Sequence, residues 1–336
     1  MKINRVEFCK ALEIVKPGLA NKELIEQSTS FAFIKDHVVT YNEEISVSHP
    51  VTGLEIEGAV KADELYQLLT KLKGDEIEMI LDENEVRIIS GKMKAGLIFI
   101  SKIKLPLKSL GEIGKWKTLP KNFVSAIEFT APSANKDSTR PVLTCIHFKG
   151  KTVEASDGYR IASYQLDETL PVKEFLMRSP AAKEIVKMNP VKIAEGEKWI
   201  HFQTEAKTIL SCRIVSDDFP DTKNQMIVEG KDLTFPKTIN AILDKASVFA
   251  NRKHRLEEFV KITLEKDLVL VESTSDSGWF KEEAHMRYKY DKRQFFITPY
   301  LLKGILEESC VGVLGDNRIK FVGSNWTYVA LLRENE

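Results

Sequence analysis

The chain has 336 residues, of which 43% are hydrophobic and 29% charged, and its 49 basic side chains equal its 49 acidic ones. This length exceeds what one hydrophobic core usually organises and predicts two or three domains. Zero net charge argues against a protein that grips nucleic acid over its whole surface, and no apolar run approaches the ~18 residues of a membrane helix. The N-terminus lacks the apolar stretch of a secretion signal, so we expect a cytoplasmic protein. Widely spaced cysteines are expected to be reduced thiols: Cys9, Cys145, Cys212 and Cys310.

Apolar residues spaced at i, i+3, i+4 and i+7 predict an amphipathic helix in three places. The three stripes are Phe8-Ala11-Leu12-Val15, Phe123-Ala126-Ile127-Thr130 and Ile239-Ile242-Leu243-Ala246. From position 8 to 123 is 115 residues and from 123 to 239 is 116, so the pattern is an internal repeat.

A second helical stripe follows in each copy of the repeat. The stripes are Leu65-Leu68-Leu69-Leu72, Ala182-Ile185-Val186-Asn189 and Leu302-Ile305-Leu306-Ser309. From 65 to 182 is 117 residues and from 182 to 302 is 120. Two stripes that recur three times at nearly one separation predict three structural units of the same design.

Extended runs between and after the helices predict strands, so that each unit reads helix, three strands, helix, three strands. The predicted strands are 30–34, 37–41, 45–50, 76–81, 85–90, 95–101, 143–148, 152–156, 160–166, 191–194, 199–204, 208–215, 259–264, 268–273, 282–290, 312–314, 318–322 and 328–332.

The fold class predicted from this pattern is α+β, with antiparallel sheets and two helices in each of three repeated domains. Gly, Pro and charged residues collect near 110–117 and 217–231, which predicts linkers there. The predicted domains are therefore 1–113, 117–220 and 230–336. Each unit leaves edge strands open, and head-to-tail pairing of such edges with a constant turn closes a ring.

The segment 139–161 reads TRPVLTCIHFKGKTVEASDGYRI and predicts a hairpin with a turn at 149–151 and a tight bend at Asp157-Gly158. The pattern of apolar residues, taken by itself, is explained by an ordinary buried hairpin. The specific residues indicate more than a hairpin, because Thr-Arg-Pro-Val-Leu followed by Ser-Asp-Gly-Tyr-Arg-Ile closely resembles the middle-domain signature of the bacterial DNA sliding clamp. That clamp is the β subunit of the replicative DNA polymerase.

The resemblance implies a processivity factor with the DNA clamp fold. Two chains of three domains would form a homodimeric ring around duplex DNA, with helices lining the hole. An ATP-driven clamp loader would place the ring, which would tether DNA polymerase and other replication or repair proteins. The resemblance implies no catalysis and no cofactor. At the level of individual residues, the resemblance to the family is clear in three places: 139–161, Phe219-Pro220-Asp221 and the C-terminal strand.

Basic residues lie on or next to the polar sides of the predicted helices, and any one of them is better explained as a solvated surface residue. As a set facing a hole, they would screen duplex phosphates without reading bases. The resemblance also implies that the loop 135–140 reaches DNA. The expected DNA-facing residues are Lys10, Lys16, Lys71, Lys73, Lys136, Arg140, Lys183, Lys187, Lys245, Arg252, Lys253 and Lys303.

The resemblance further implies an apolar cleft that receives a short linear peptide from partner proteins. The matching residues are Leu143, Ser156, Gly158, Tyr159, Arg160, Ile161, Met226, Val228, Val329 and Leu331. Tyr159 stands where His is common, and the last strand lacks the usual Met-Pro-Met ending. These departures suggest an altered peptide preference and a divergent clamp, such as one encoded by a phage.

For the dimer seam, the resemblance points to Leu97 and Phe99 meeting Val248 and Phe249 of a second chain. Core packing explains these four residues equally well.

Two other classes of function stay open. An enzyme would need a site, and Ser133, His147 and Asp157 lack the strand-turn-helix context of a nucleophile elbow. His147 alternates with apolar neighbours and is better explained as a packed histidine. The second alternative is an interaction scaffold that has the clamp fold but does not encircle DNA.

Overall fold

The computed structural model describes residues 1–137, 139–250 and 258–333. The chain divides into two compact units. Unit 1 comprises Met1–Glu128 with Asp167–Ser216, and unit 2 comprises Phe129–Leu166 with Asp217–Glu336. Each unit is described by itself. The predicted middle domain, 117–220, contributes to both units, and the three domain boundaries stay a prediction.

All six predicted amphipathic helices form. They are α1 (Arg5–Val15), α2 (Ala62–Lys71), α3 (Phe123–Thr130), α4 (Ser179–Met188), α6 (Ile239–Ala250) and α7 (Pro299–Glu308), and a further short helix is α5 (Lys223–Met226). The predicted stripes of α1, α3 and α6 are buried in full. The α+β class is confirmed, and every strand pairing in the two units is antiparallel within the described chain.

The strands repeat three times in the same order around the helices. The first copy has β1 (Lys2–Asn4), β2 (Ser30–Ile34), β3 (His37–Tyr41), β4 (Ile45–Pro50), β5 (Gly58–Lys61), β6 (Glu76–Leu81), β7 (Glu85–Ser90) and β8 (Met93–Ile100). The second has β9 (Lys117–Thr118), β10 (Cys145–Lys149), β11 (Thr152–Ser156), β12 (Arg160–Gln165), β13 (Phe175–Arg178), β14 (Lys192–Glu195), β15 (Trp199–Gln203) and β16 (Ile209–Val215). The third has β17 (Lys231–Thr234), β18 (Val260–Glu265), β19 (Leu268–Ser275), β20 (Gly278–His285), β21 (Arg293–Ile297), β22 (Val311–Leu314), β23 (Arg318–Val322) and β24 (Trp326–Leu331).

The expectation of six strands in each copy was wrong, because the described residues already form eight in every copy. A short strand opens each copy (β1, β9, β17), and another runs directly into the second helix (β5, β13, β21). These strands have two to five residues, which is too short for a period-2 pattern to stand out. In the third copy the predicted strand 282–290 instead spans Gly278–His285.

Two strand pairings join successive copies of the repeat. In unit 1, β4 pairs with β16, with Ile45 opposite Cys212. In unit 2, β12 pairs with β24, with Ile161 opposite Val329. The same junction therefore occurs once in each unit, between the fourth strand of one copy and the last strand of the next.

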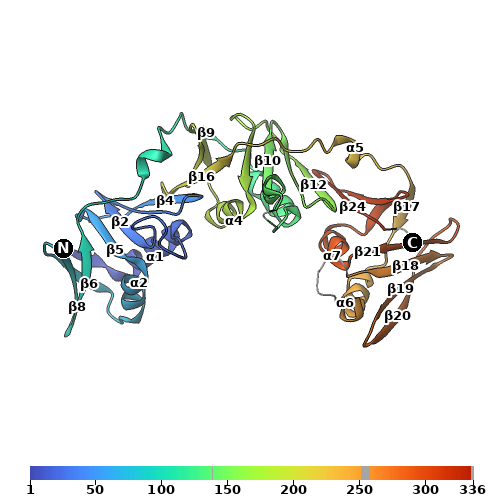
Figure 1. Cartoon of the computed structure of the whole chain (residues 1–336), viewed down its shortest axis with the longest axis horizontal. Helices are drawn as coiled ribbons and strands as arrows, with labels where there is room; N and C mark the ends of the chain where they lie inside the picture. Colours follow the sequence, from blue (N-terminus) through green and yellow to red (C-terminus); the bar gives the residue numbers. More distant parts are fainter. Residues whose placement is uncertain (138, 251–257, 334–336) are drawn as a thin grey trace. The chain divides into compact units, whose positions relative to one another are not determined.

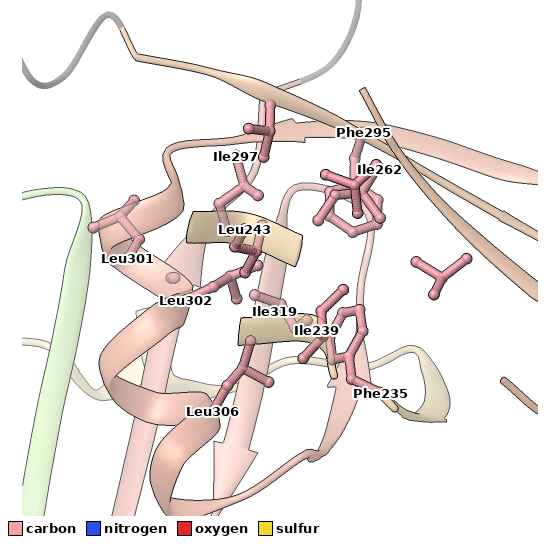
Figure 2. Packing of buried hydrophobic residues seen from close by; sticks show 14 of the residues in the cluster. Phe235, Ile239, Leu243, Ile262, Phe295, Ile297, Leu301, Leu302, Leu306 and Ile319 are labelled. Atoms are coloured by element: carbon pink, nitrogen blue, oxygen red, sulfur yellow. The ribbon is translucent and has the colours of Figure 1, made fainter. Parts of the chain in front are cut away.

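The two helices of the third copy pack together on the sheet. In Figure 1, α6 and α7 lie beside each other at one side of β18 to β20, and they contact one another. Figure 2 shows Leu243 of α6 among Leu301, Leu302 and Leu306 of α7, with Ile262 and Phe295 of the sheet nearby. All six side chains are at most 4% exposed. The helical stripes are thus the core of the repeat.

Two strands of eight residues each lie at sheet edges. Along Met93–Ile98, β8 pairs with β7 alone among the described strands, and β20 pairs with β19 alone among them. Exposed and partly buried residues alternate along both strands. No helix of the described chain is long and apolar enough to cross a membrane.

Candidate functional site

The bend at Asp157-Gly158 positions the candidate site between β11 and β12 of unit 2. Gly158 has a φ of 88°, which favours glycine. The Asp157 carboxylate accepts hydrogen bonds from the backbone N–H groups of Tyr159 and Arg160, each at 3.0 Å. The Ser156 hydroxyl accepts from Gly158 N at 3.1 Å and donates to Arg160 O at 2.8 Å. The Ser-Asp-Gly string therefore folds into one rigid turn, as predicted.

Arg160 is held in place from several sides. Its Nε donates to Asp157 Oδ2 at 3.0 Å, Nη2 donates to Pro132 O, and the guanidinium lies 5.0 Å from the centroid of the Tyr300 ring. Burial opposes its charge, but Tyr328 and Asp157 raise the pKa of Arg160 above its usual value. Burial in turn raises the pKa of Tyr328 to about 12. Arg160 is therefore a charged and fixed part of the site.

A cavity of about 370 Å³ opens beside this turn, and we call it the cleft. Eight of the ten predicted cleft residues line it: Leu143, Ser156, Gly158, Tyr159, Arg160, Ile161, Val329 and Leu331. Met226 and Val228 are not among the residues that line it. The other lining residues are Arg140, Pro220, Asp221, Thr222, Gln225 and Arg318. The structure thus gathers into one cavity residues that lie up to 191 positions apart in the chain, from Arg140 to Leu331.

Gly158 lines the cleft without a side chain that would fill it. A Cβ atom placed there would lie 3.8 Å from Arg140 Nη1 and 4.0 Å from Leu143 Cδ1, both of which line the cleft. Any side chain at this position would therefore occupy the cavity as well as strain the turn. Arg140, predicted to face DNA, lies at the cleft.

The segment that borders the cleft is tied to the signature hairpin. The Thr222 hydroxyl donates to Glu154 Oε2 at 2.6 Å, and Glu154 Oε1 lies 2.8 Å from His147 Nδ1. The His147 ring stacks on Phe219 with centroids 4.9 Å apart. His147 is thus a packed histidine whose Nδ1 faces Glu154. The described residues contain no group of three or more His, Cys, Asp or Glu that could hold a metal.

The predicted DNA-facing lysines fall into two groups. Lys10, Lys71, Lys73, Lys136 and Lys183 are exposed. The other four described lysines have acidic partners: Lys16 pairs with Glu13 at 2.9 Å, Lys187 with Glu184 at 2.7 Å, Lys245 with Glu282 and Lys303 with Asp244. Arg252 and Lys253 lie outside the described residues. Whether any of these residues meets DNA stays a prediction.

The predicted seam residues differ in exposure. Phe99 is 3% exposed, and its ring covers Gly58, where an added Cβ would lie within 2.3 Å of it. Leu97 and Phe249 are partly buried, whereas Val248 is 69% exposed. The large hydrophobic residues that the edge strands expose most are Ile98 at 78% and Trp279 at 71%. Sequence reasoning missed both, although the alternation along each strand could have indicated them.

Comparison with solved structures finds the same fold over the whole chain. The DNA polymerase III subunit beta of Pseudomonas aeruginosa aligns with a TM-score of 0.88 and 16% identity, covering 100% of both chains. The DnaN sliding clamp of Bartonella birtlesii, bound to griselimycin, aligns with a TM-score of 0.89 and 18% identity over 100% of this chain and 99% of that one. The beta subunit of Thermotoga maritima gives 0.83 and 18% over the same shares. The sequence matches no family profile and no curated protein. The chain therefore has the fold of these bacterial DNA sliding clamps, at a sequence identity of 16–18%.

Proposed function

We propose that this protein is a DNA sliding clamp: a homodimeric ring that encircles duplex DNA without reading its sequence and tethers a polymerase to it. The observation that carries the proposal is the fold, since the threefold repeat aligns over the full chain with DNA polymerase III beta subunits. Enclosure needs no bond-making chemistry. In this proposal the protein is therefore not an enzyme and needs no cofactor. We also propose that it works in the cytoplasm.

The two free edge strands support a homodimer. Strands β8 and β20 have eight residues each, and each has an edge with no partner strand along most of its length within the described chain. Strand β8 exposes Ile98 and Ile100, and β20 exposes Trp279. Such edges favour pairing with another chain. If β8 of one chain pairs with β20 of the other, two-fold symmetry creates the seam twice and both edges are covered.

The cleft supports the tethering role. It combines apolar side chains, such as Leu143, Ile161, Val329 and Leu331, with a few fixed polar groups, which suits a short linear peptide. We assign this cleft to the polymerase, the ATP-driven clamp loader and other partners, which would dock there in turn.

The charge on the helices favours a second candidate, a scaffold with the clamp fold that does not encircle DNA. The six long helices carry seven basic and nine acidic side chains. Weak attraction is compatible with a ring, which holds DNA by closure, but a scaffold would need no basic surface at all.

Retention on end-blocked DNA distinguishes the two candidates without a loader. A linear duplex is fixed to a bead at one end, and the protein is allowed to thread onto its free end. The free end is then blocked with streptavidin. A clamp should stay on the blocked duplex through a wash at high salt and leave when a restriction enzyme cuts it. Equal loss from blocked and open duplex, or a monomeric mass at the assay concentration, would contradict the clamp and favour the scaffold.

A further inference from the structure

The two repeat junctions carry very different side chains at matching positions. Tyr41 ends β3 and Ser156 ends β11, and from 41 to 156 is 115 residues. Trp199 begins β15 and Arg318 begins β23, and from 199 to 318 is 119 residues. These offsets agree with the repeat. The aromatic pair of unit 1, with ring centroids 5.9 Å apart, is thus replaced in unit 2 by a serine and an arginine.

In unit 1 the chain itself covers the aromatic pair. Leu105 is buried in one cluster with Tyr41 and Trp199, and Ile103 and Leu107 pack against that cluster. The Gln27 side chain brackets this segment, since Nε2 donates to Lys102 O at 2.8 Å and Oε1 accepts from Lys104 N at 2.7 Å. The junction of unit 1 is therefore filled by an internal segment with apolar residues at alternate positions.

In unit 2 the matching segment does not fill the junction. By the offset of 115, Leu105 corresponds to Pro220 and Leu107 to Thr222, which are smaller or polar and line an open cavity of about 370 Å³. Ile227, farther along this segment, is 63% exposed. The cleft is thus equivalent in position to the site in unit 1 that the chain fills with its own segment, but in unit 2 this position is open.

Arg318 has hydrogen-bonding capacity to spare at the cleft. Its Nη1 reaches only the carbonyl oxygens of Gln225 at 3.3 Å and Asn224 at 3.5 Å, and within the described chain its Nε has no hydrogen-bond partner. A guanidinium has five N–H donors in a geometry that fits a carboxylate.

The charges around the cleft leave a positive excess. Three arginines line it, and Asp221 is the one acidic residue among the described residues that do so. Asp157 neutralises Arg160 at 3.0 Å. Arg140 and Arg318 thus outnumber Asp221, so the cleft is complementary to a negatively charged occupant.

We propose that the cleft binds an internal, extended segment of a partner protein that places an Asp or Glu side chain against Arg318 and apolar side chains against Leu143 and Val329. This rests on the proposed tethering role and adds to it the chemistry of the segment. The carboxylate comes from a side chain and not from a chain end, because the occupant of the equivalent site in unit 1 continues in both directions.

The segment of unit 1 provides the probe. Three peptides with the sequence of residues 101–110, acetylated and amidated at their ends, carry Leu, Glu or Gln at the position of Leu105. Binding of labelled peptide to the full-length protein is followed by fluorescence anisotropy. The Glu peptide should bind at least about tenfold more tightly than the Gln peptide, as expected for a charge-assisted pair.

Variants of the protein assign this preference to Arg318. Arg318→Met keeps the aliphatic bulk and should remove the preference for Glu. Arg318→Glu should reverse the preference, so that a fourth peptide with Lys at the same position binds more tightly than the Glu peptide. Arg87→Met, which removes an exposed arginine in unit 1, is the matched control and should bind like the unaltered protein.

Equal affinity for the Glu and Gln peptides, a preference that survives Arg318→Met, or no binding of any peptide would overturn the inference. End-blocked DNA retention would still stand in each of those cases, so failure here is separable from failure of the clamp assignment. A Gln peptide with a free C-terminal carboxylate tests where the bound carboxylate comes from. If it binds more tightly than the capped Glu peptide, the carboxylate belongs to a chain end and the inference of a side-chain carboxylate is wrong.

Discussion

The proposed dimer seam should be weakened by a single substitution on an edge strand. Ile98 is 78% exposed on β8, where it contributes nothing to the core of its own chain. Fully burying an isoleucine side chain stabilises by about 1.5–3 kcal/mol, so covering this residue in a seam is worth roughly 1–2 kcal/mol. Two-fold symmetry doubles the effect in the dimer.

Ile98→Asp should therefore raise the dissociation constant of the dimer by about a hundredfold, since about 3 kcal/mol corresponds to two factors of ten. Trp279→Asp on β20 should act in the same direction and at least as strongly, because an aromatic side chain buries more area. Sedimentation equilibrium over a range of protein concentrations measures the constant, and thermal unfolding of the monomer checks that each variant folds.

Leu24→Asp is the matched control, because Leu24 is 88% exposed but lies outside any strand. It should dimerise as the unaltered protein does. If Ile98→Asp and Trp279→Asp also dimerise unchanged, the seam does not use these two edges and the reasoning fails.

Three further predictions concern the stability of the fold and the site. Burial lowers the pKa of His201 to about 4, so the unfolded chain binds a proton that the folded chain does not; between pH 7 and pH 4.5 this costs about 2.5 kcal/mol of unfolding free energy. Urea unfolding at both pH values should show the His201→Gln variant losing less stability than the unaltered protein, and an identical loss would contradict the assignment. Asp157→Ala should cost about 3 kcal/mol or more, because it leaves the Arg160 guanidinium largely buried without its carboxylate; an unchanged urea midpoint would refute this. Leu243→Ala, in the core of the third copy (Figure 2), should cost about 2–5 kcal/mol in the same assay, whereas a cost below 1 kcal/mol would show that the site collapses without a cavity.

The helical part of the fold could be predicted because long amphipathic stripes are a strong local signal. Phe8, Ala11, Leu12 and Val15 are all at most 5% exposed, as their spacing requires. Short strands gave no such signal. Strand β5, for example, has four residues, Gly58–Lys61, of which the first three are buried, so neither its length nor its pattern separates it from a loop.

The candidate site was only partly predictable, for a different physical reason. The residues of the Ser-Asp-Gly-Tyr-Arg-Ile string are neighbours in the chain, and their turn is fixed by local hydrogen bonds such as those of Asp157. Arg318 reaches the same cavity from a strand 158 residues beyond Arg160, and no local pattern marks it. Counting the repeat offset from Trp199 would have placed it at the junction, although its unsatisfied Nε becomes visible only in three dimensions.

The helix charges constrain how the protein could hold DNA. Four of the nine described lysines predicted to face DNA are paired with acidic side chains, and exposed pairs of this kind attract phosphates weakly. A protein that bound DNA through these helices by affinity alone would need a surplus of basic side chains. Its affinity for DNA would fall steeply as the salt concentration rises. Seven basic against nine acidic side chains provide no such surplus. If the protein is the clamp proposed above, long residence on DNA would therefore come from closure of the ring. The strength of the β8 and β20 edges, and not of the basic residues, would then set how long the protein stays.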